Sequence, residues 1–359
     1  MTAKGPLSGL RVLEFAGIGP GPHCAMLLSD LGADVVRIDR EGGNGWPNPV
    51  MDRGRASIVL DPRTTEGRDD CLKIAAIADV LIEGFRPGVM ERLGLGPDEL
   101  LARNPRLVYG RITGWGQDGP YAQTAGHDIN YIGLTGALSA MGKPGDTPAP
   151  PLNLVGDFGG GSFLLAFGIM AALYERNRSG RGQLVDAAIV DGVASMMGMF
   201  TGLLPSGQIS VDRSDNLLGG AAPFYRVYTC ACGGEIAVGA LEPKFFAEFA
   251  RRLGAPADFL VKQYDKSSWP EMESFIRQRF AGQDQAHWIS VFSGSDACVT
   301  PVVALNNVLV DPHIAARNTY TEAAGVVSPS PVPKFSRTPG HAQVARNGRD
   351  VVDTWLDSN

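Results

Sequence analysis

The chain has 359 residues, of which 44% are hydrophobic and 19% are charged, and its formal net charge at pH 7 is -6. This length and composition are typical of a globular protein with a large core and more than one domain. The acidic balance excludes a protein that binds nucleic acid through a strongly basic surface.

Signals for membranes and targeting are missing from the sequence. No apolar run reads as long enough to span a bilayer, no signal or transit peptide opens the chain, and its last residues do not match the peroxisomal Ser-Lys-Leu signal. We therefore expect a cytoplasmic protein with no membrane partner. The five scattered cysteines favour a reducing compartment, and Cys230 and Cys232 lack a second Cys/His pair at zinc-site spacing, so we expect no metal.

The first two hundred residues alternate β-branched runs with amphipathic stretches. The runs predict strands over 11–15, 34–38, 57–60, 79–83 and 107–112, and the stretches between them predict helices over 22–31, 65–76 and 87–93. A longer apolar helix is predicted over 161–177, and residues 183–199 begin as a strand and become another helix. Repeated strand–helix–strand units predict an α/β domain with a parallel sheet covered on both faces.

A second domain is predicted after a linker. Residues 201–224 lose periodicity and collect Gly, Ser, Pro and Asp, which is linker composition. Two short strands, 226–229 and 235–238, are followed by helical segments, which indicates a small α+β domain with its return linker over 225–324. A proline-rich tail carries the chain back, so we expect the large domain to contain residues 1–200 and 325–359.

A glycine-rich turn, Gly17 to Pro22, follows the first strand and resembles a dinucleotide-binding fingerprint. Pro22 replaces the third glycine of that fingerprint, and the prolines remove N–H donors that a pyrophosphate would need. A tight strand-to-helix turn with Pro22 at the first helical position explains the same residues.

Three segments place an ionisable group in a glycine-rich or apolar setting, where a shifted pKa and close approach of a ligand are both feasible. They contain His127, in Gly126 to Tyr131, then Asp157, in Gly156 to Gly161, and Glu242, at a strand end in the small domain. Taken singly, Asp157 could be a helix N-cap and His127 a packed or capping histidine.

These segments, in this order, resemble the α-methylacyl-CoA racemase branch of the family III CoA transferases. The resemblance extends over nearly the whole chain and is carried by residues 6–12, 30–37, 84–89, 113–117, 126–131, 153–157 and 296–301. It implies a large Rossmann-like domain, a small domain and an interlocked homodimer. It further implies an isomerase of lipid metabolism that interconverts the R and S configurations of 2-methylacyl-CoA thioesters.

The resemblance assigns catalytic roles to His127, Asp157 and Glu242. Inverting a stereocentre through a planar enolate requires a base on each face, and His127 and Asp157 match that pair. His127 is implied to remove the α-proton of the S substrate and Asp157 that of the R substrate. Glu242 matches a glutamate that approaches the histidine from the partner chain, so the active site is shared between chains. Backbone N–H groups of the turn at Asp157, at a helix N-terminus, are expected to stabilise the enolate oxygen.

The same resemblance predicts the residues that bind the CoA ester. Arginines suit its phosphates because their donors are forked and permanently charged. The predicted substrate-binding residues are Arg40, Leu60, Arg63, Arg86, Arg92, Tyr131, Asn153 and Gly156. CoA is part of the substrate, and the chemistry requires no further cofactor and no metal.

Two other functions remain open from the sequence. A family III CoA transferase would form an acyl anhydride on Asp157, would need a second carboxylic acid and would not need His127. An acyl-CoA-binding protein would use His127 and Asp157 only as polar lining of its pocket. For any single arginine, a solvated surface role competes with a ligand role.

Overall fold

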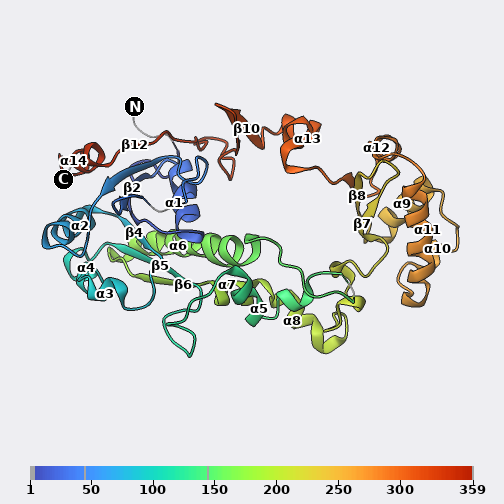
Figure 1. Cartoon of the computed structure of the whole chain (residues 1–359), viewed down its shortest axis with the longest axis horizontal. Coiled ribbons are helices and arrows are strands. Elements are labelled where there is room, and N and C mark those ends of the chain that lie inside the picture. Colours follow the sequence, from blue (N-terminus) through green and yellow to red (C-terminus); the bar gives the residue numbers. More distant parts are fainter. Residues whose placement is uncertain (1–4, 44–45, 144, 358–359) are drawn as a thin grey trace. The chain divides into compact units, whose positions relative to one another are not determined.

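The computed structural model describes residues 5–43, 46–143 and 145–357, which form two compact units (Figure 1). The first unit contains the chain up to Thr135, then Pro151–Met197 and the chain from Pro312 onward. The second contains Gly136–Pro150 and Gly198–Asp311. The sequence predicted that residues 136–150 belong to the large domain and that the chain returns to this domain at residue 325. Segment 136–150 instead contacts the segment after 198, where Arg213 Nη1 donates to the carbonyl of Ser139 at 3.0 Å.

A seven-stranded sheet is the centre of the first unit. Its strands are β1 (Arg11–Phe15), β2 (Asp34–Asp39), β3 (Arg55–Val59), β4 (Val80–Glu83), β5 (Val108–Thr113), β6 (Leu184–Ala188) and β12 (Arg346–Asn347). They lie in the order β12-β3-β2-β1-β4-β5-β6, and every neighbouring pair is parallel. This confirms the predicted parallel sheet. The order reverses at β1 and β4, and in such sheets the ligand crevice lies beyond the carboxyl ends of the strands at that point.

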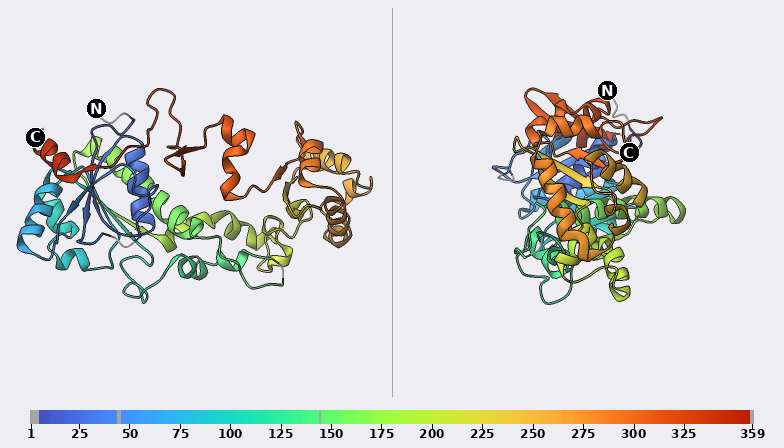
Figure 2. Two further views of the ribbon diagram at one scale, coloured as in Figure 1. Left: turned by 45° about the horizontal axis from the view of Figure 1, so that its top comes forward. Right: turned by 90° about the vertical axis from the view of Figure 1, so that its right-hand side faces the viewer.

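Helices cover both faces of this sheet because successive strand residues point to opposite sides (Figure 2). Leu13 faces a cluster built with α2 (Thr65–Ile77), α3 (Val89–Arg92), α4 (Pro97–Arg103) and α14 (Gly348–Asp357). Its neighbour Val12 faces α1 (Pro20–Asp30) and α6 (Leu164–Ser179) on the other side. The strands are consequently apolar on both faces, as expected of a buried parallel sheet.

The long helix predicted over 161–177 begins earlier in the structure. A π-helical segment, η2 (Leu154–Phe163), runs directly into α6. Asp157 therefore lies inside the first turn of η2 and is not an N-cap residue. Three consecutive glycines, Gly159 to Gly161, hid this segment from the periodicity because glycine is a poor helix former.

The continuous helix Leu154–Ser179 is long and apolar enough to cross a membrane by length and composition, with 33% of its most apolar window buried. The expectation that no such run exists is therefore wrong on these two criteria. A helix that begins at residue 161, as the periodicity predicts, is too short to show this run. Leu165 and Ile169, on one side of this helix, are fully buried in the core next to the sheet.

The remaining elements of the first unit are short. They are α5 (Asp128–Leu134), α7 (Ile189–Met196), α13 (Pro312–Ala316) and the antiparallel hairpin of β10 (Tyr320–Ala323) and β11 (Val326–Pro329). The hairpin is fastened to the unit by Arg53, which donates to the Pro329 carbonyl at 2.9 Å.

The second unit is a small α+β fold, as predicted. Its antiparallel sheet contains β7 (Tyr225–Thr229), β8 (Glu235–Gly239) and β9 (Val299–Pro301). The helices are α8 (Gly198–Leu203), α9 (Pro243–Leu253), α10 (Phe259–Lys262), α11 (Trp269–Ala281) and α12 (Gln285–Phe292). Aromatic side chains dominate its core, among them the buried Phe246, Phe280 and Trp288.

Candidate active site

Asp157 lies in a half-buried position on the π-helical segment η2. Asn153 Nδ2 donates to its Oδ2 at 3.2 Å. Burial raises the pKa of the Asp157 carboxyl above its usual value, with Asp128 adding to the shift and Asn153 and His127 opposing it. The Asp157 carboxyl group therefore binds its proton more tightly than an ordinary aspartate does.

Asp128 joins the helix α5 to η2. Its buried carboxylate accepts a hydrogen bond from the Asp157 N–H at 2.7 Å, although the two residues are 29 positions apart. A Cβ on Gly156 would lie 2.5 Å from Asp128 Oδ2, so only glycine fits at position 156. The bond therefore holds α5 close to η2. His127 is the N-cap of α5, and it acts to lower the pKa of Asp157.

This contact corrects one expectation. The N–H of Asp157 is donated to Asp128, and the N–H of Phe158 is donated to the Asn153 carbonyl at 3.2 Å. Two of the donors that the sequence offered to an enolate oxygen are therefore already hydrogen-bonded in the structure. Asp128 lies in the segment Gly126 to Tyr131, where the sequence pattern alone assigns it no role; its position directly after His127 is the signal that points to it.

Tyr131 braces the loop that leads into His127. Its hydroxyl donates to the Gly126 carbonyl at 2.5 Å, and its ring meets Trp115 edge-on at 4.7 Å between centroids. Burial raises the pKa of Tyr131 to about 12, with the charges of Asp157 and Asp128 contributing. A Cβ on Gly114 would overlap the Tyr131 ring, which explains the glycine there.

The glycine-rich turn after β1 faces Asp157. Gly19 is the N-cap of α1 with φ 71°, and Pro20 rather than Pro22 occupies the first helical position. A Cβ on Gly19 would lie 3.1 Å from Asp157 Oδ2. The positive end of α1 is therefore adjacent to the carboxyl group.

Three of the predicted CoA-binding residues follow the carboxyl ends of parallel strands. Arg40 comes directly after β2, Leu60 after β3 and Arg86 shortly after β4, while Arg92 ends α3. Arg40, Arg86 and Arg92 are exposed, and Leu60 is buried. Carboxyl ends of parallel strands share one edge of a sheet, so Arg40, Leu60 and Arg86 lie at the same rim, and α3 carries Arg92 a few residues after Arg86.

Arg63 differs from the other arginines. It is highly exposed and is paired with its near neighbour Asp61, at 2.8 Å between Nη2 and Oδ2. A surface pair of this kind contributes little to stability, and Arg63 can leave Asp61 at small cost.

A buried arginine outside the predicted set of site residues holds the loop that carries Arg86 and the helix that carries Arg92. Arg111 on β5 donates to Glu83 at 2.7 Å, to Glu91 at 2.6 Å and to Gln117 at 2.9 Å. These partners lie at the end of β4, on α3 and in the loop after β5. Charge-assisted bonds to three segments fix their relative positions.

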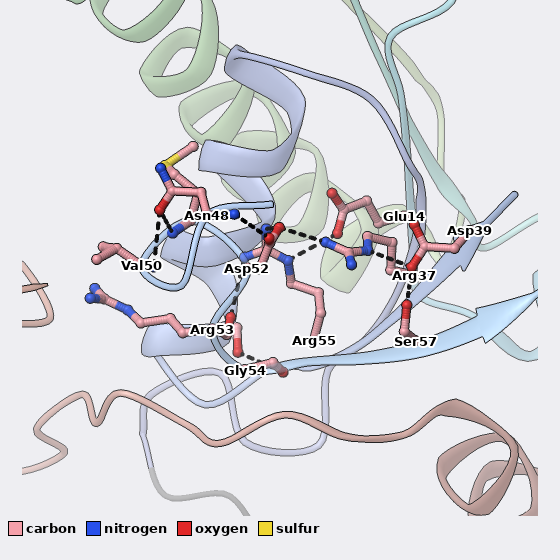
Figure 3. A network of polar contacts seen from close by, with 12 residues as sticks. Glu14, Arg37, Asp39, Asn48, Val50, Asp52, Arg53, Gly54, Arg55 and Ser57 are labelled. Atoms are coloured by element: carbon pink, nitrogen blue, oxygen red, sulfur yellow. Dashed lines mark hydrogen bonds and ion pairs between the residues drawn. The ribbon is translucent and has the colours of Figure 1, made fainter. Parts of the chain in front are cut away.

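A second polar network supports the loop that carries Arg40 (Figure 3). Arg37 donates to Asp39 at 3.0 Å and to Asp52 at 2.8 Å. Arg55 on β3 lies 3.2 Å from Glu14 on β1, and both side chains are almost fully buried. The network connects β1, β2, β3 and the segment before β3.

Glu242 belongs to the second unit. It is the exposed N-cap of α9, and its side chain makes no capping hydrogen bond. Among residues 5–43, 46–143 and 145–357, no three His, Cys, Asp or Glu side chains are grouped so that they could hold a metal ion.

The fold and the site define a doubly wound α/β protein with an imidazole and a carboxyl group at the ligand edge of its sheet. A family model described as CoA-transferase family III matches residues 7–347, and the chain belongs to this family. It is similar to the mouse (Mus musculus) protein named alpha-methylacyl-CoA racemase, with 44% identity over 95% of this chain and 89% of that protein. The human (Homo sapiens) protein of the same name is 42% identical over 93% of this chain and 87% of that protein.

One solved structure supports the fold. A CAIB/BAIF family protein from Brucella suis superposes with a TM-score of 0.84 at 26% identity, covering 98% of this chain and 100% of that chain.

Proposed function

We propose that this protein is an isomerase that interconverts the R and S configurations at the α-carbon of 2-methylacyl-CoA thioesters. The observation that carries the proposal is the hydrogen bond from the Asp157 N–H to Asp128, which ties the segment of Asp157 to the helix that begins directly after His127. Full-length similarity to the mouse and human racemases supports the same reaction.

The proposed mechanism transfers protons with two bases. His127 removes the α-proton of the S thioester to give an enolate, and Asp157 protonates the opposite face; the roles exchange in the reverse direction. The half-buried position of Asp157 raises the pKa of its carboxyl group, which supports this role because the group then binds a proton more tightly than an ordinary aspartate. The reaction moves only a proton, so the proposal includes no metal and no resident cofactor.

Stabilisation of the enolate oxygen has to come from groups close to Asp157. The Asp157 N–H can serve only if it is shared with Asp128, so we assign part of this work to the positive end of α1. The rim arginines Arg40, Arg86 and Arg92, with Arg63 freed from Asp61, are proposed to hold the phosphates of CoA, with Leu60 near the adenine. Tyr131, Asn153 and Gly156 lie around Asp157 and are proposed to border the acyl thioester.

We further propose that the protein is a homodimer in which Glu242 of the second unit reaches the partner's His127. One side of the helix η2–α6 carries four exposed apolar side chains at helical spacing: Phe163, Phe167, Met170 and Tyr174. Phe167 and Tyr174 are 72% and 71% exposed. Such a stripe is costly in water, and a second chain that covers it would remove that cost.

A cytoplasmic location stays a prediction.

The test uses one epimer of a 2-methylacyl-CoA in deuterated water. We expect the wild type to lose configuration and gain α-deuterium together, and His127→Ala and Asp157→Asn to lose epimerisation by about 10²-fold or more. Lys73→Ala, an exposed change on α2, is the control and should match the wild type.

Two outcomes would contradict the proposal. Transfer of CoA to an added carboxylic acid, dependent on Asp157 but not on His127, would assign the chain to the transferases. Binding of the thioester without any exchange would leave only an acyl-CoA-binding protein.

A further inference from the structure

His23, on the first turns of α1, makes three contacts with the π-helical segment, one of them an edge-on contact with the Phe163 ring at 5.6 Å between centroids. Its Nδ1 and the Ser162 hydroxyl share a hydrogen bond at 2.7 Å. Its ring stacks on Phe158 with 4.5 Å between centroids and 29° between planes. Ser162 is fully buried and His23 is half-buried, so water competes little for this bond.

The contacts with Phe158 and Ser162 lie at the two ends of the glycine run in η2. Phe158 directly follows Asp157, and Ser162 is five residues after Asp157, which is one repeat of the i→i+5 hydrogen-bonding pattern of a π-helix. Between Phe158 and Ser162 there are only Gly159, Gly160 and Gly161. Glycine gains conformational freedom when a turn unfolds, and π-helical turns are rare because they are weakly stable alone. The geometry of this turn therefore has to be imposed by its neighbours.

The charge state of His23 suits this task. Burial, together with the charges of Arg53 and Arg55, lowers the pKa of His23 to about 4. The ring is consequently neutral at physiological pH and places no positive charge beside Asp157.

We propose that His23 is a positioning residue for Asp157: with Ser162 and Phe158 it holds the glycine-rich π-turn so that the carboxyl group meets the substrate on one face. This inference deepens the proposed racemase function and rests on it. His127 has a support of its own in Asn130, whose Oδ1 accepts the His127 N–H at 3.0 Å, in addition to the Asp128 bond that links α5 to η2. Loss of the His23 contacts should therefore weaken one of the two bases and leave the other in place.

The two bases can be measured separately. In deuterated water, wash-in of deuterium from the S epimer reports proton removal by His127, even when the enolate returns to S. Wash-in from the R epimer reports removal by Asp157. Inversion in either direction needs both bases. A variant that misplaces only Asp157 will lose R wash-in and inversion but keep S wash-in.

Three variants separate the contacts. Ser162→Ala removes one oxygen and the hydrogen bond; His23→Phe removes the bond but keeps the stacked ring; His23→Asn keeps a polar group near the Nδ1 position but removes the ring. The matched control is Asn130→Ala, which loosens the His127 loop and should give the opposite asymmetry.

We expect R wash-in to fall about tenfold to a hundredfold in Ser162→Ala and His23→Phe, with S wash-in within about twofold of wild type, because small misplacements of a reacting group are costly. His23→Asn should recover part of the R rate. Equal loss of both wash-in rates, or no loss in Ser162→Ala, would overturn the positioning role while leaving the racemase assignment intact. A wild type that shows no exchange would instead overturn the proposed function, and this inference with it.

Discussion

Glu14 is a single residue whose environment has a measurable consequence. It is fully buried on β1, 3.2 Å from Arg55, and neither of its carboxylate oxygens has a hydrogen-bond partner among the described residues. Burial raises the pKa of Glu14 to about 7, against the opposing charges of Arg55 and Arg37. The desolvation of the carboxylate thus outweighs the attraction of its buried partner.

This raised pKa predicts a pH dependence of stability. An acid whose pKa is higher in the folded than in the unfolded state binds more protons when folded, so its contribution is full below about pH 4.5 and is lost as the pH rises through about 7. Glu14→Gln cannot titrate, and its stability relative to the wild type should rise between pH 4.5 and 7. Urea unfolding at several pH values measures this difference.

The control for this experiment is Glu41→Gln, which changes an exposed carboxyl group near the same loop. It shows how a change from Glu to Gln outside the buried network affects unfolding at the same pH values. A Glu14→Gln profile parallel to that of the wild type would show that Glu14 stays ionised in the folded protein.

Among the secondary-structure elements, the contact between η2 and α7 decides how the site is packed. A Cβ on Gly192 of α7 would lie 1.9 Å from the carbonyl oxygen of Gly160, and a Cβ on Gly160 would lie 2.7 Å from Val193. The two elements therefore touch backbone to backbone. Because no flexible side chain separates the two backbones at this point, the contact between η2 and α7 has little capacity to adjust.

We predict that Gly192→Ala separates these elements and destabilises the protein by about 1–3 kcal/mol, because overpacked contacts force the backbone to shift. Epimerisation should fall as well, since Asp157 is carried by η2. Gly202→Ala on α8 is the matched control, since a Cβ there meets nothing within 4 Å and alanine favours helix. Thermal unfolding and epimerisation rates of both variants test the prediction; equal behaviour would contradict it.

The arrangement of the whole molecule is tested by complementation between chains. If Glu242 acts on the partner's His127, a mixed dimer of a His127→Ala chain and a Glu242→Gln chain contains one complete site. Co-expressed and purified with two different tags, this dimer should show about half of the wild-type rate, because one of two symmetric sites is intact. Each variant alone should be strongly impaired. If the mixed dimer is as inactive as the two parent variants, Glu242 acts on the His127 of its own chain. If the protein sediments as a monomer, the proposed homodimer is wrong.

The sequence by itself determined the features that depend on short-range patterns. Runs such as Val12-Leu13 and the amphipathic stretches between strands predicted the parallel sheet with two helical layers, since side-chain periodicity is a local property. The motifs around His127 and Asp157 pointed to the family because long strings of specific residues rarely recur by chance. Element boundaries were less accurate, as at β3, which begins at Arg55 rather than residue 57.

Only the tertiary structure decided which distant residues meet. The bond from the Asp157 N–H to Asp128, the His23 contacts with Ser162 and Phe158, and the three bonds of Arg111 join segments far apart in the chain. The π-helical form of residues 154–163 was hidden for the same reason: its glycines have no helical preference of their own, so packing against α1 and α7 imposes their conformation. Local patterns fix what each segment can be, whereas the geometry of a site depends on contacts that no local pattern contains.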